Sequence, residues 1–401
     1  MADLARGADD HCGLPHRRSA ALLPQRAGEA DLTAQLIGAA SLVSVEAALD
    51  VLLGGLEPVA PVEVPLAAAM GAVLAHAPIA VLPIPADDRA AIDGFALRSG
   101  DLSGASPYAP LALAAPPRFV SVGDPLPEGC DCVLDGGLVE QAGPLALVIG
   151  EARPGEGVRR RGADMGAGDP LLRPGARLGP LDALLARNAG LERMLVRRPR
   201  LRLVEMNGAA GGPTLSLVAA LAAQATAILD HRPVGERQAF APEGCDALLT
   251  IGGTGTGSGD ATASRLADAG WTVHHGIALQ PGRTSAVGRQ GDAALVALPG
   301  SPDAALAAWL VLVEPLLRHL SSARPSAPRQ VRLSRKIASD AGHAELALLA
   351  QTAEGTYEPL TVGALPLHAL RDASAWTLVP AGSEGHPAGA TIPVHPLPGR
   401  P

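Results

Sequence analysis

The chain has 401 residues, of which 47% are hydrophobic and 18% are charged. This length exceeds what one hydrophobic core usually supports, and the composition excludes a disordered chain, so we expect three or four folded units. The formal net charge of -8 argues against a general nucleic-acid binder, because phosphate contacts need clustered Lys and Arg. A small anionic ligand is not excluded, since one local group of arginines and backbone amides is enough to bind it.

The first 43 residues have mixed charge, scattered Pro and Gly, and no continuous apolar core. We interpret them as a variable extension that is neither a signal peptide nor a transmembrane start. The four cysteines lack the spacing of a structural zinc site, and without a secretory signal they are expected to be reduced thiols. These features predict a cytoplasmic protein without a membrane partner.

Two helices are predicted next along the chain. The run SVEAALDVLLGGL begins with Ser44 at an N-cap position and continues with apolar residues at helical spacing. The run VPLAAAMGAVLA, residues 64–75, is predicted to form the second helix. The prolines of VLPIPADD then stop that helix and make residues 81–88 a loop.

The loop leads to Asp93-Gly94, within the stretch DDRAAIDGFALR. An Asp at a loop tip could hold a hydrated divalent cation or act on a phosphate ester. The dipeptide also favours a tight hairpin turn without chemical function, and taken alone it favours that turn.

Two Gly-rich and Pro-rich stretches follow. VSVGDPLPEGCDCVL, residues 120–134, contains a rigid Pro-x-Pro-Glu-Gly turn between two predicted strands. Residues 153–190 predict a basic β segment and then a helix. In that segment Arg159, Arg160 and Arg161 could cradle an oxyanion, or they could belong to a solvated charged strand.

From residue 200 to about residue 324, apolar strands alternate with helices through short connections. This alternation predicts a parallel sheet with helices on both faces, and in such sheets ligands lie beyond the carboxyl ends of the strands. Three loops are therefore candidates: Asn207-Gly208 after the first strand, residues 252–260 after the second, and residues 299–302 after the third.

The second of these loops reads GGTGTGSGD. Its glycines permit positive backbone angles and a close approach of amides to an anion, and the hydroxyls of Thr254, Thr256 and Ser258 add donors. The loop is not a Walker loop, because the Lys-Ser/Thr ending is absent, and it lacks the Rossmann glycine spacing. It predicts a phosphate site.

Two short turns complete the series. LQPGRT, residues 279–284, places a cation, Arg283, after a Pro-Gly pair. ALPGSP, residues 297–302, leads into a long apolar helix whose N-terminus favours an anion.

Together these stretches resemble the molybdopterin molybdenumtransferase family. Asp93 falls in a stretch similar to the family's "SAMDGYA" motif, residues 122–134 are similar to "TGAPLPEGADAVV", and residues 252–260 resemble the pterin-binding loop "GGVSVGEAD". The two later turns look like "KPGKP" and "LPGNP", and Asp164 falls on the acidic position of a "GED" turn. The resemblance covers about residues 44–397, with the motifs in the family's order and at nearly its spacing.

The resemblance implies a multidomain α/β fold, with a doubly wound α/β molybdopterin-binding domain, a β-rich insertion domain and a small C-terminal β domain. The expected parts are a variable N-terminal extension at 1–43, a helical and β linker domain at 44–85 and 173–197, the insertion domain at 86–172, the molybdopterin-binding domain at 198–325 and the C-terminal domain at 326–401. It also implies a homodimer with a shared cleft, Mg²⁺ as the cation, and adenylated molybdopterin and molybdate as ligands. Molybdoenzymes or other cofactor-synthesis proteins are the implied partners.

Site residues are carried over by motif position. Asp93, Asp164 and Asp260 take the catalytic positions, and Asp93 and Asp260 are the implied metal ligands. The implied substrate-binding residues are Gly252, Gly253, Thr254, Thr256, Gly257, Ser258, Arg283, Pro299, Gly300, Ser301 and Pro302.

Several positions depart from the family pattern. Val122 replaces a Thr and cannot form its hydrogen bond, and Thr284 replaces the second Pro of "KPGKP". Ala209 and Ala210 stand where the family's "TGDEL" carries two carboxylates, a loss that weakens a metal-assisted step.

Three hypotheses follow. The first is an enzyme that inserts molybdate into adenylated molybdopterin and releases AMP. The alternative is a catalytically weakened carrier or scaffold for the cofactor, as in the gephyrin branch of the family, and the third is an enzyme acting on another nucleotide-like phosphate.

Overall fold

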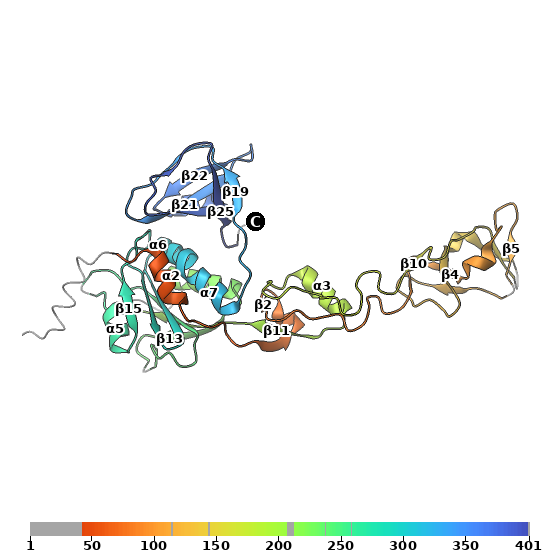
Figure 1. Cartoon of the computed structure of the whole chain (residues 1–401), viewed down its shortest axis with the longest axis horizontal. Helices are drawn as coiled ribbons and strands as arrows, with labels where there is room; N and C mark the ends of the chain where they lie inside the picture. Colours follow the sequence, from red (N-terminus) through yellow and green to blue (C-terminus); the bar gives the residue numbers. More distant parts are fainter. Residues whose placement is uncertain are drawn as a thin grey trace, which may run out of the picture. The chain divides into compact units, whose positions relative to one another are not determined.

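The structure is a computed structural model, and it describes residues 42–113, 115–142, 145–206, 212–236, 238–257 and 259–399. Predictions that fall outside these ranges concern the N-terminal extension, the Asn207-Gly208 loop with Ala209 and Ala210, and Ser258. Figure 1 shows the elements described below.

The α/β part is built on a six-stranded sheet in the order β13-β12-β14-β18-β17-β15. Four adjacent strands are parallel to one another: β13 (Ile228–Pro233), β12 (Arg200–Glu205), β14 (Ala247–Ile251) and β18 (Ala293–Leu298). The predicted parallel sheet is confirmed for β12, β14 and β18, whereas β13 was not among the predicted strands. Two further strands, β17 (Ala286–Gln290) and β15 (Thr272–His275), pair antiparallel at one edge and were not predicted, because their His, Gly and Arg residues interrupt any apolar run.

Helices cover both faces of this sheet, as the alternation of elements predicts. Leu203, Leu249 and Val296 point into one core with the helices α2 (Val45–Leu53), α4 (Pro213–Gln224), α6 (Pro302–Ala308), η5 (Trp309–Val313) and α7 (Glu314–Ser321). Leu248 and Leu295, one position along their strands, face the opposite core, where Leu266 of α5 (Thr262–Asp268) also packs.

The three segments α6, η5 and α7 form one helix, Pro302–Ser321, which by length and composition could cross a membrane. However, 72% of its most apolar window is buried inside the protein. It packs against the sheet and against α2, so we interpret it as the central helix of this core.

The segment before residue 80 confirms one predicted helix and corrects the other. Ser44 caps α2, and its Oγ accepts a hydrogen bond from the backbone N of Ala47 at 3.1 Å. The predicted helix at 64–75 is wrong: this run forms the end of β1 (Val62–Pro65), a 3-10 turn, η2 (Leu66–Ala69), and β2 (Val73–Leu74). Gly71, with φ of +76°, turns the chain so that both strands pair with β11 (Arg193–Arg197).

The linker sheet β1-β11-β2 has a small core of its own. Its apolar residues pack against α3 (Pro180–Asn188), the helix predicted at the end of the 153–190 stretch. The apolar residues that suggested a helix at 64–75 are therefore used by strand pairing and by this core instead.

The β-rich insertion consists of three small sheets, β10-β3, β6-β4-β7 and β5-β9-β8. Its elements are β3 (Arg89–Ala90), β4 (Gly94–Leu97), η3 (Ser99–Leu102), β5 (Leu111–Ala112), β6 (Arg118–Val120), β7 (Cys132–Asp135), η4 (Gly136–Leu138), β8 (Val139–Ala142), β9 (Leu145–Val148) and β10 (Val158–Arg159). The turn predicted between two strands at 120–134 connects β6 to β7.

The C-terminal part is also β-rich and has a separate core. Its elements are β19 (Arg329–Arg332), β20 (Ile337–Ala338), β21 (Ala344–Gln351), β22 (Tyr357–Val362), α8 (Leu367–Asp372), β23 (Ala375–Val379), β24 (Gly385–His386) and β25 (Thr391–Pro396), and β16 (Leu279–Gln280) joins β21. The multidomain α/β fold is thus confirmed, whereas the residue limits of its domains stay predictions.

Candidate functional site

The Gly-rich loop leaves the carboxyl end of β14 in a conformation that requires glycine. Gly252 and Gly253 have φ of +87° and +65°, in the left-handed region where a side chain is strained. The backbone N of Gly252 donates to the carbonyl of Leu298 at 2.9 Å, and the Thr262 hydroxyl donates to the carbonyl of Gly252 at 2.8 Å. Gly252 is therefore tied to the sheet through its N–H and to the first turn of α5 through its carbonyl.

Asp260 closes the loop on itself. Its Oδ2 accepts a hydrogen bond from the backbone N of Gly257 at 2.9 Å, and its own N donates to the carbonyl of Gly257 at 2.9 Å. A Cβ at Gly255 would lie 2.5 Å from the same carboxylate oxygen, so a side chain there would displace the Asp260 carboxylate. The Gly257 amide is thus engaged within the chain, and no hydrogen bond to the second oxygen, Oδ1, is formed by the residues that the structure describes.

The two predicted threonine donors that the structure describes differ in exposure. Thr254 is 3% exposed, and its hydroxyl donates to the hydroxyl of Thr284 at 3.3 Å. Thr256 is exposed and faces solvent from the same loop. Only the second hydroxyl therefore remains open to an incoming phosphate.

The turn after β18 lies beside the Gly-rich loop. A Cβ at Gly300 would come within 3.4 Å of the Cα of Gly252, and the Thr214 hydroxyl donates to the carbonyl of Gly300 at 2.7 Å. Ser301 and Pro302 are exposed at the start of α6, whereas Pro299 is buried. Two of the three predicted loops thus meet at the carboxyl edge of the sheet.

Arg283 lies on the turn between β16 and β17. Its side chain is exposed, and its carbonyl accepts a hydrogen bond from the backbone N of Ile277 at 3.0 Å. The hydroxyl contact of the next residue, Thr284, with Thr254 joins this turn to the Gly-rich loop. Arg283, the cation predicted from LQPGRT, therefore lies on a turn that contacts the Gly-rich loop.

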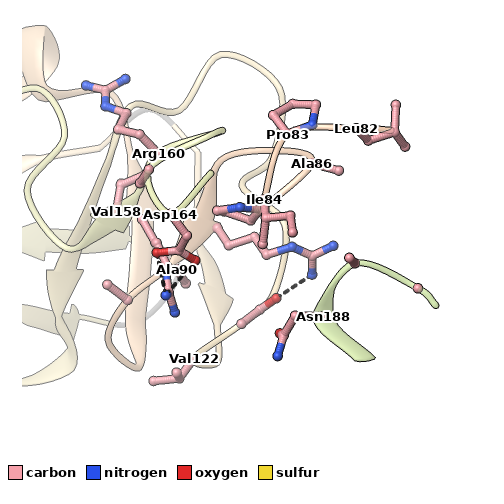
Figure 2. Close-up of a pocket in the computed structure, with 18 of the residues that line it drawn as sticks. Leu82, Pro83, Ile84, Ala86, Ala90, Val122, Val158, Arg160, Asp164 and Asn188 are labelled. Atoms are coloured by element: carbon pink, nitrogen blue, oxygen red, sulfur yellow. Dashed lines mark hydrogen bonds and ion pairs between the residues drawn. The ribbon is translucent and has the colours of Figure 1, made fainter. Parts of the chain in front are cut away.

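A second concave surface lies in the insertion, next to the end of α3. It is a pocket of about 1130 Å³, and Figure 2 shows the residues around it. The charged residues in its lining are Arg89, Arg159, Arg160, Arg187 and Asp164. Four guanidinium groups and one carboxylate favour an anionic ligand.

Asp164 and the neighbouring arginines form specific pairs here. Arg159 Nη2 lies 2.6 Å from Asp164 Oδ2, an ion pair that Figure 2 marks. Asp88 Oδ2 lies 3.4 Å from Arg160 Nη1, and its Oδ1 accepts a hydrogen bond from the backbone N of Arg161 at 2.6 Å. Arg159 and Arg160 line the pocket, and Arg161 does not, so the three arginines do not form one cradle.

Asp93 does not line this pocket itself, but it forms a hydrogen bond with Val122, which does. Its Oδ1 accepts a hydrogen bond from the backbone N of Val122 at 2.7 Å, and the Val122 side chain is 62% exposed in the pocket lining. The backbone contact needs no hydroxyl, so the change from Thr leaves it in place. The hairpin interpretation of Asp93-Gly94 is wrong, because Gly94 begins β4, which pairs with β6 and β7 and not with β3.

The three predicted catalytic aspartates do not gather into one cluster. Asp93 and Asp164 belong to the insertion, and Asp260 belongs to the loop after β14. Over the part of the chain that the structure describes, no group of three or more His, Cys, Asp or Glu side chains could hold a metal ion.

Four side chains at these surfaces were missed by sequence reasoning: Arg89, Arg187, Asn188 and His275. Arg89 Nη1 donates to the carbonyl of Gly123 at 2.7 Å across the pocket wall, and Asn188 is at the end of α3. His275 Nε2 lies 2.8 Å from the carbonyl oxygen of Thr254. A single Arg, Asn or His residue carries no local pattern that distinguishes it from an ordinary surface residue, even where it lies within a stretch identified from the sequence.

Asp131, inside the PEGCDCVL stretch, has a structural role. Its Oδ1 accepts a hydrogen bond from the backbone N of Ser99 at 2.7 Å, and its Oδ2 accepts one from the Ser99 hydroxyl at 2.8 Å. These two hydrogen bonds hold the pKa of the Asp131 carboxyl below its ordinary value, and the bond from the Ser99 backbone has the larger effect.

This lowered pKa predicts a pH-dependent stability of the insertion. A carboxyl whose pKa is lower in the folded state stabilises that state above its unfolded pKa, and the contribution is lost as the pH falls through the folded pKa. We therefore expect the thermal unfolding temperature of the wild type to fall below about pH 4 more steeply than that of Asp131→Asn. Asp101→Asn, an exposed change in the same region, is the control and should keep the wild-type profile. Parallel profiles for Asp131→Asn and the wild type would contradict this role.

Comparison with known proteins agrees with this arrangement. Residues 43–190 match the family model described as "MoeA N-terminal region (domain I and II)", and residues 219–319 match the "Probable molybdopterin binding domain". Molybdopterin molybdenumtransferase of Synechococcus elongatus is 27% identical over 405 residues, covering 89% of this chain and 100% of the relative. Molybdopterin molybdenumtransferase 2 of Mycobacterium tuberculosis is 27% identical over 303 residues, covering 64% of this chain and 75% of the relative.

A solved structure supports the fold. The molybdopterin biosynthesis moea protein from Pyrococcus horikosii aligns with a TM-score of 0.67 at 24% identity, covering 88% of this chain and 98% of that one. The two family models lie on the insertion with its linker and on the α/β part, in the order that the sequence motifs predict. The chain belongs to the molybdopterin molybdenumtransferase family.

Proposed function

We propose that this chain acts in molybdenum cofactor biosynthesis, in the cytoplasm, by inserting molybdate into adenylated molybdopterin with release of AMP. The observation that carries the proposal is the paired turns at the carboxyl edge of the sheet. Gly252 and Gly253 hold positive φ angles there, and a Cβ at Gly300 would lie 3.4 Å from the Cα of Gly252. Such a backbone surface admits a phosphate closely, and relatives of similar length carry the name of this enzyme.

The proposed ligand contacts are divided between the two surfaces. At the α/β edge, the exposed Thr256 hydroxyl and the Arg283 guanidinium would meet the phosphate of the adenylated pterin. The Gly257 backbone is already engaged by Asp260. The remaining predicted substrate-binding residues would contribute backbone atoms to the same edge: Gly253, Pro299, Gly300, Ser301 and Pro302. In the insertion, the arginine-lined pocket beside Asp164 would accept a second anionic group.

The residues present could bind Mg²⁺ only if the phosphate oxygens of the substrate completed its ligand set. This cation prefers one or two protein carboxylates, retained waters and phosphate oxygens over a cage made entirely of protein groups. Asp260 offers one carboxylate oxygen, Oδ1, at the loop that would hold the phosphate. Bound there, the cation would neutralise charge that develops on the phosphate as AMP leaves.

The chain's own groups would then act on the adenylate. Arg283 and the loop backbone orient the phosphate, and Asp260 fixes the loop through Gly257. Water attacks the phosphoanhydride between the pterin phosphate and AMP, so AMP leaves with one phosphate and the pterin keeps the other. The two dithiolene thiols then replace one oxygen of molybdate, which leaves as water with their two protons, and both sulfurs bind molybdenum. From the insertion side, Asp93 would orient the attacking water, and Asp164 would hold the Arg159 guanidinium toward molybdate.

A homodimer would bring an insertion of one copy to the α/β edge of the other. Helix α3 supports this with three exposed leucines at helical spacing, Leu181 (76%), Leu184 (56%) and Leu185 (39%). An apolar stripe of this kind is typical of a surface covered by a partner. A molar mass of one chain by light scattering at micromolar concentration would contradict the dimer.

The carrier alternative is not favoured, since the relatives are named as transferases. Calorimetric titration with adenylated molybdopterin, followed by addition of molybdate and Mg²⁺ with AMP detection, separates the two. Binding followed by AMP release supports the enzyme. Tight binding without release would make the chain a carrier, and no binding would contradict both.

A further inference from the structure

One side chain outside the predicted motifs contacts the Gly-rich loop directly. His275 is the last residue of β15, and its Nε2 lies 2.8 Å from the carbonyl oxygen of Thr254. A carbonyl oxygen accepts and never donates, so Nε2 carries the proton in this contact. The loop is thereby tied to the antiparallel edge of the sheet, a part of the sheet that no sequence motif marks.

A second contact holds Thr254 through its side chain, whereas the first holds its backbone carbonyl. The Thr254 hydroxyl donates to the hydroxyl of Thr284 at 3.3 Å, and Thr254 is 3% exposed. The family pattern has a proline where Thr284 stands, and proline has no side-chain acceptor. This contact is therefore a feature of this chain, and it connects the loop to the turn that carries Arg283.

Both contacts fall on a glycine-rich segment, in which the backbone has many accessible conformations. Residues 252–257 include four glycines, and glycine loses more conformational entropy than other residues when it is fixed. A loop that must present amides to a phosphate binds more weakly if it samples other conformations, because only the competent fraction binds. Two hydrogen bonds on Thr254 raise that fraction before any ligand arrives.

We propose that His275 and Thr284 form a latch on Thr254 that positions the Gly-rich loop for the phosphate of its ligand. The proposal rests on the proposed function for the identity of the ligand, and it assigns His275 and Thr284 as positioning residues. The latch acts on binding rather than on bond breaking, because neither side chain needs to touch the reacting atoms.

The test compares His275→Ala and His275→Gln with His274→Ala. His274 precedes His275 on the same strand and faces the opposite side of the sheet, so it is a matched control. Amide hydrogen exchange of residues 254–257 in the ligand-free protein should be about fivefold faster in His275→Ala, the effect of one net hydrogen bond. The Kd for adenylated molybdopterin should rise by a similar factor while kcat stays within about twofold.

Gln reaches the same carbonyl with an N–H donor, so His275→Gln should restore most of both effects, and His274→Ala should match the wild type. Thr284→Val should also speed exchange, and Thr284→Ser should not. Unchanged exchange in His275→Ala, or a Gln variant no better than the Ala variant, would overturn the latch. If the wild type binds no adenylated molybdopterin, the proposed function fails, and the exchange measurement still decides whether the latch holds the loop.

Discussion

Replacing Asp260 by Asn is expected to slow AMP release from adenylated molybdopterin by about 100-fold, with the Kd for the same ligand changed by less than about fivefold. The carboxylate has two separate functions in this account. Its Oδ2 accepts the hydrogen bond from Gly257, and its Oδ1 is left for the cation. Asn keeps an oxygen acceptor for Gly257 but loses the charge, so the loop stays closed while the metal-assisted step is weakened.

Two further variants sharpen this prediction. Asp260→Ala removes the loop contact as well, so it should weaken both binding and AMP release. Asp268→Asn changes an exposed carboxylate at the end of α5 and should behave as the wild type. Single-turnover AMP release and calorimetric binding are the measurements, and an Asn variant with wild-type release would remove Asp260 from the chemistry.

Replacing Gly94 by Ala is expected to destabilise the insertion by about 3 kcal/mol. A Cβ at this position would lie 2.1 Å from the carbonyl oxygen of Leu134 on the paired strand β7. A backbone oxygen cannot rotate away as a side chain can, so β4 would have to separate from β7. Asp93 directly precedes Gly94, and its contact with Val122 should be lost together with activity.

Gly100→Ala provides the matched control within the same part of the chain. No atom lies within 4 Å of a Cβ at Gly100, so this variant should unfold at the wild-type temperature. Circular dichroism melts and hydrogen exchange of β4 and β7 measure the difference. Equal stability of the two variants would show that β4 accommodates a side chain at Gly94.

Sequence alone predicts the central parallel strands and their helices because each is a long run with one period. β18 is apolar throughout, and the 20-residue helix Pro302–Ser321 is predominantly apolar. The short strands were not predictable in this way. The run at 64–75 reads as a helix by composition, but Pro65, Gly71 and the pairing with β11 decide its structure, and pairing partners far along the chain are not visible in a local pattern.

The candidate site shows the same division. The Gly-rich loop was identified from its glycines, since the residue type itself determines the available backbone angles. Its internal contacts were not, because the position of Thr254 depends on His275 and Thr284 from neighbouring strands and turns. The pocket in the insertion could not be predicted either, because Arg89 and Arg187 are far apart in the sequence and line the same pocket only in the folded chain.

The central claim is that this chain places molybdenum on the pterin, and one product measurement tests it most directly. The full-length protein would be incubated with adenylated molybdopterin, molybdate and Mg²⁺, and the released pterin would be analysed by mass spectrometry for bound molybdenum. The account predicts a molybdenum-bearing dithiolene formed in equal amount with AMP. AMP without molybdenum on the pterin, or an unchanged adenylate, would contradict it.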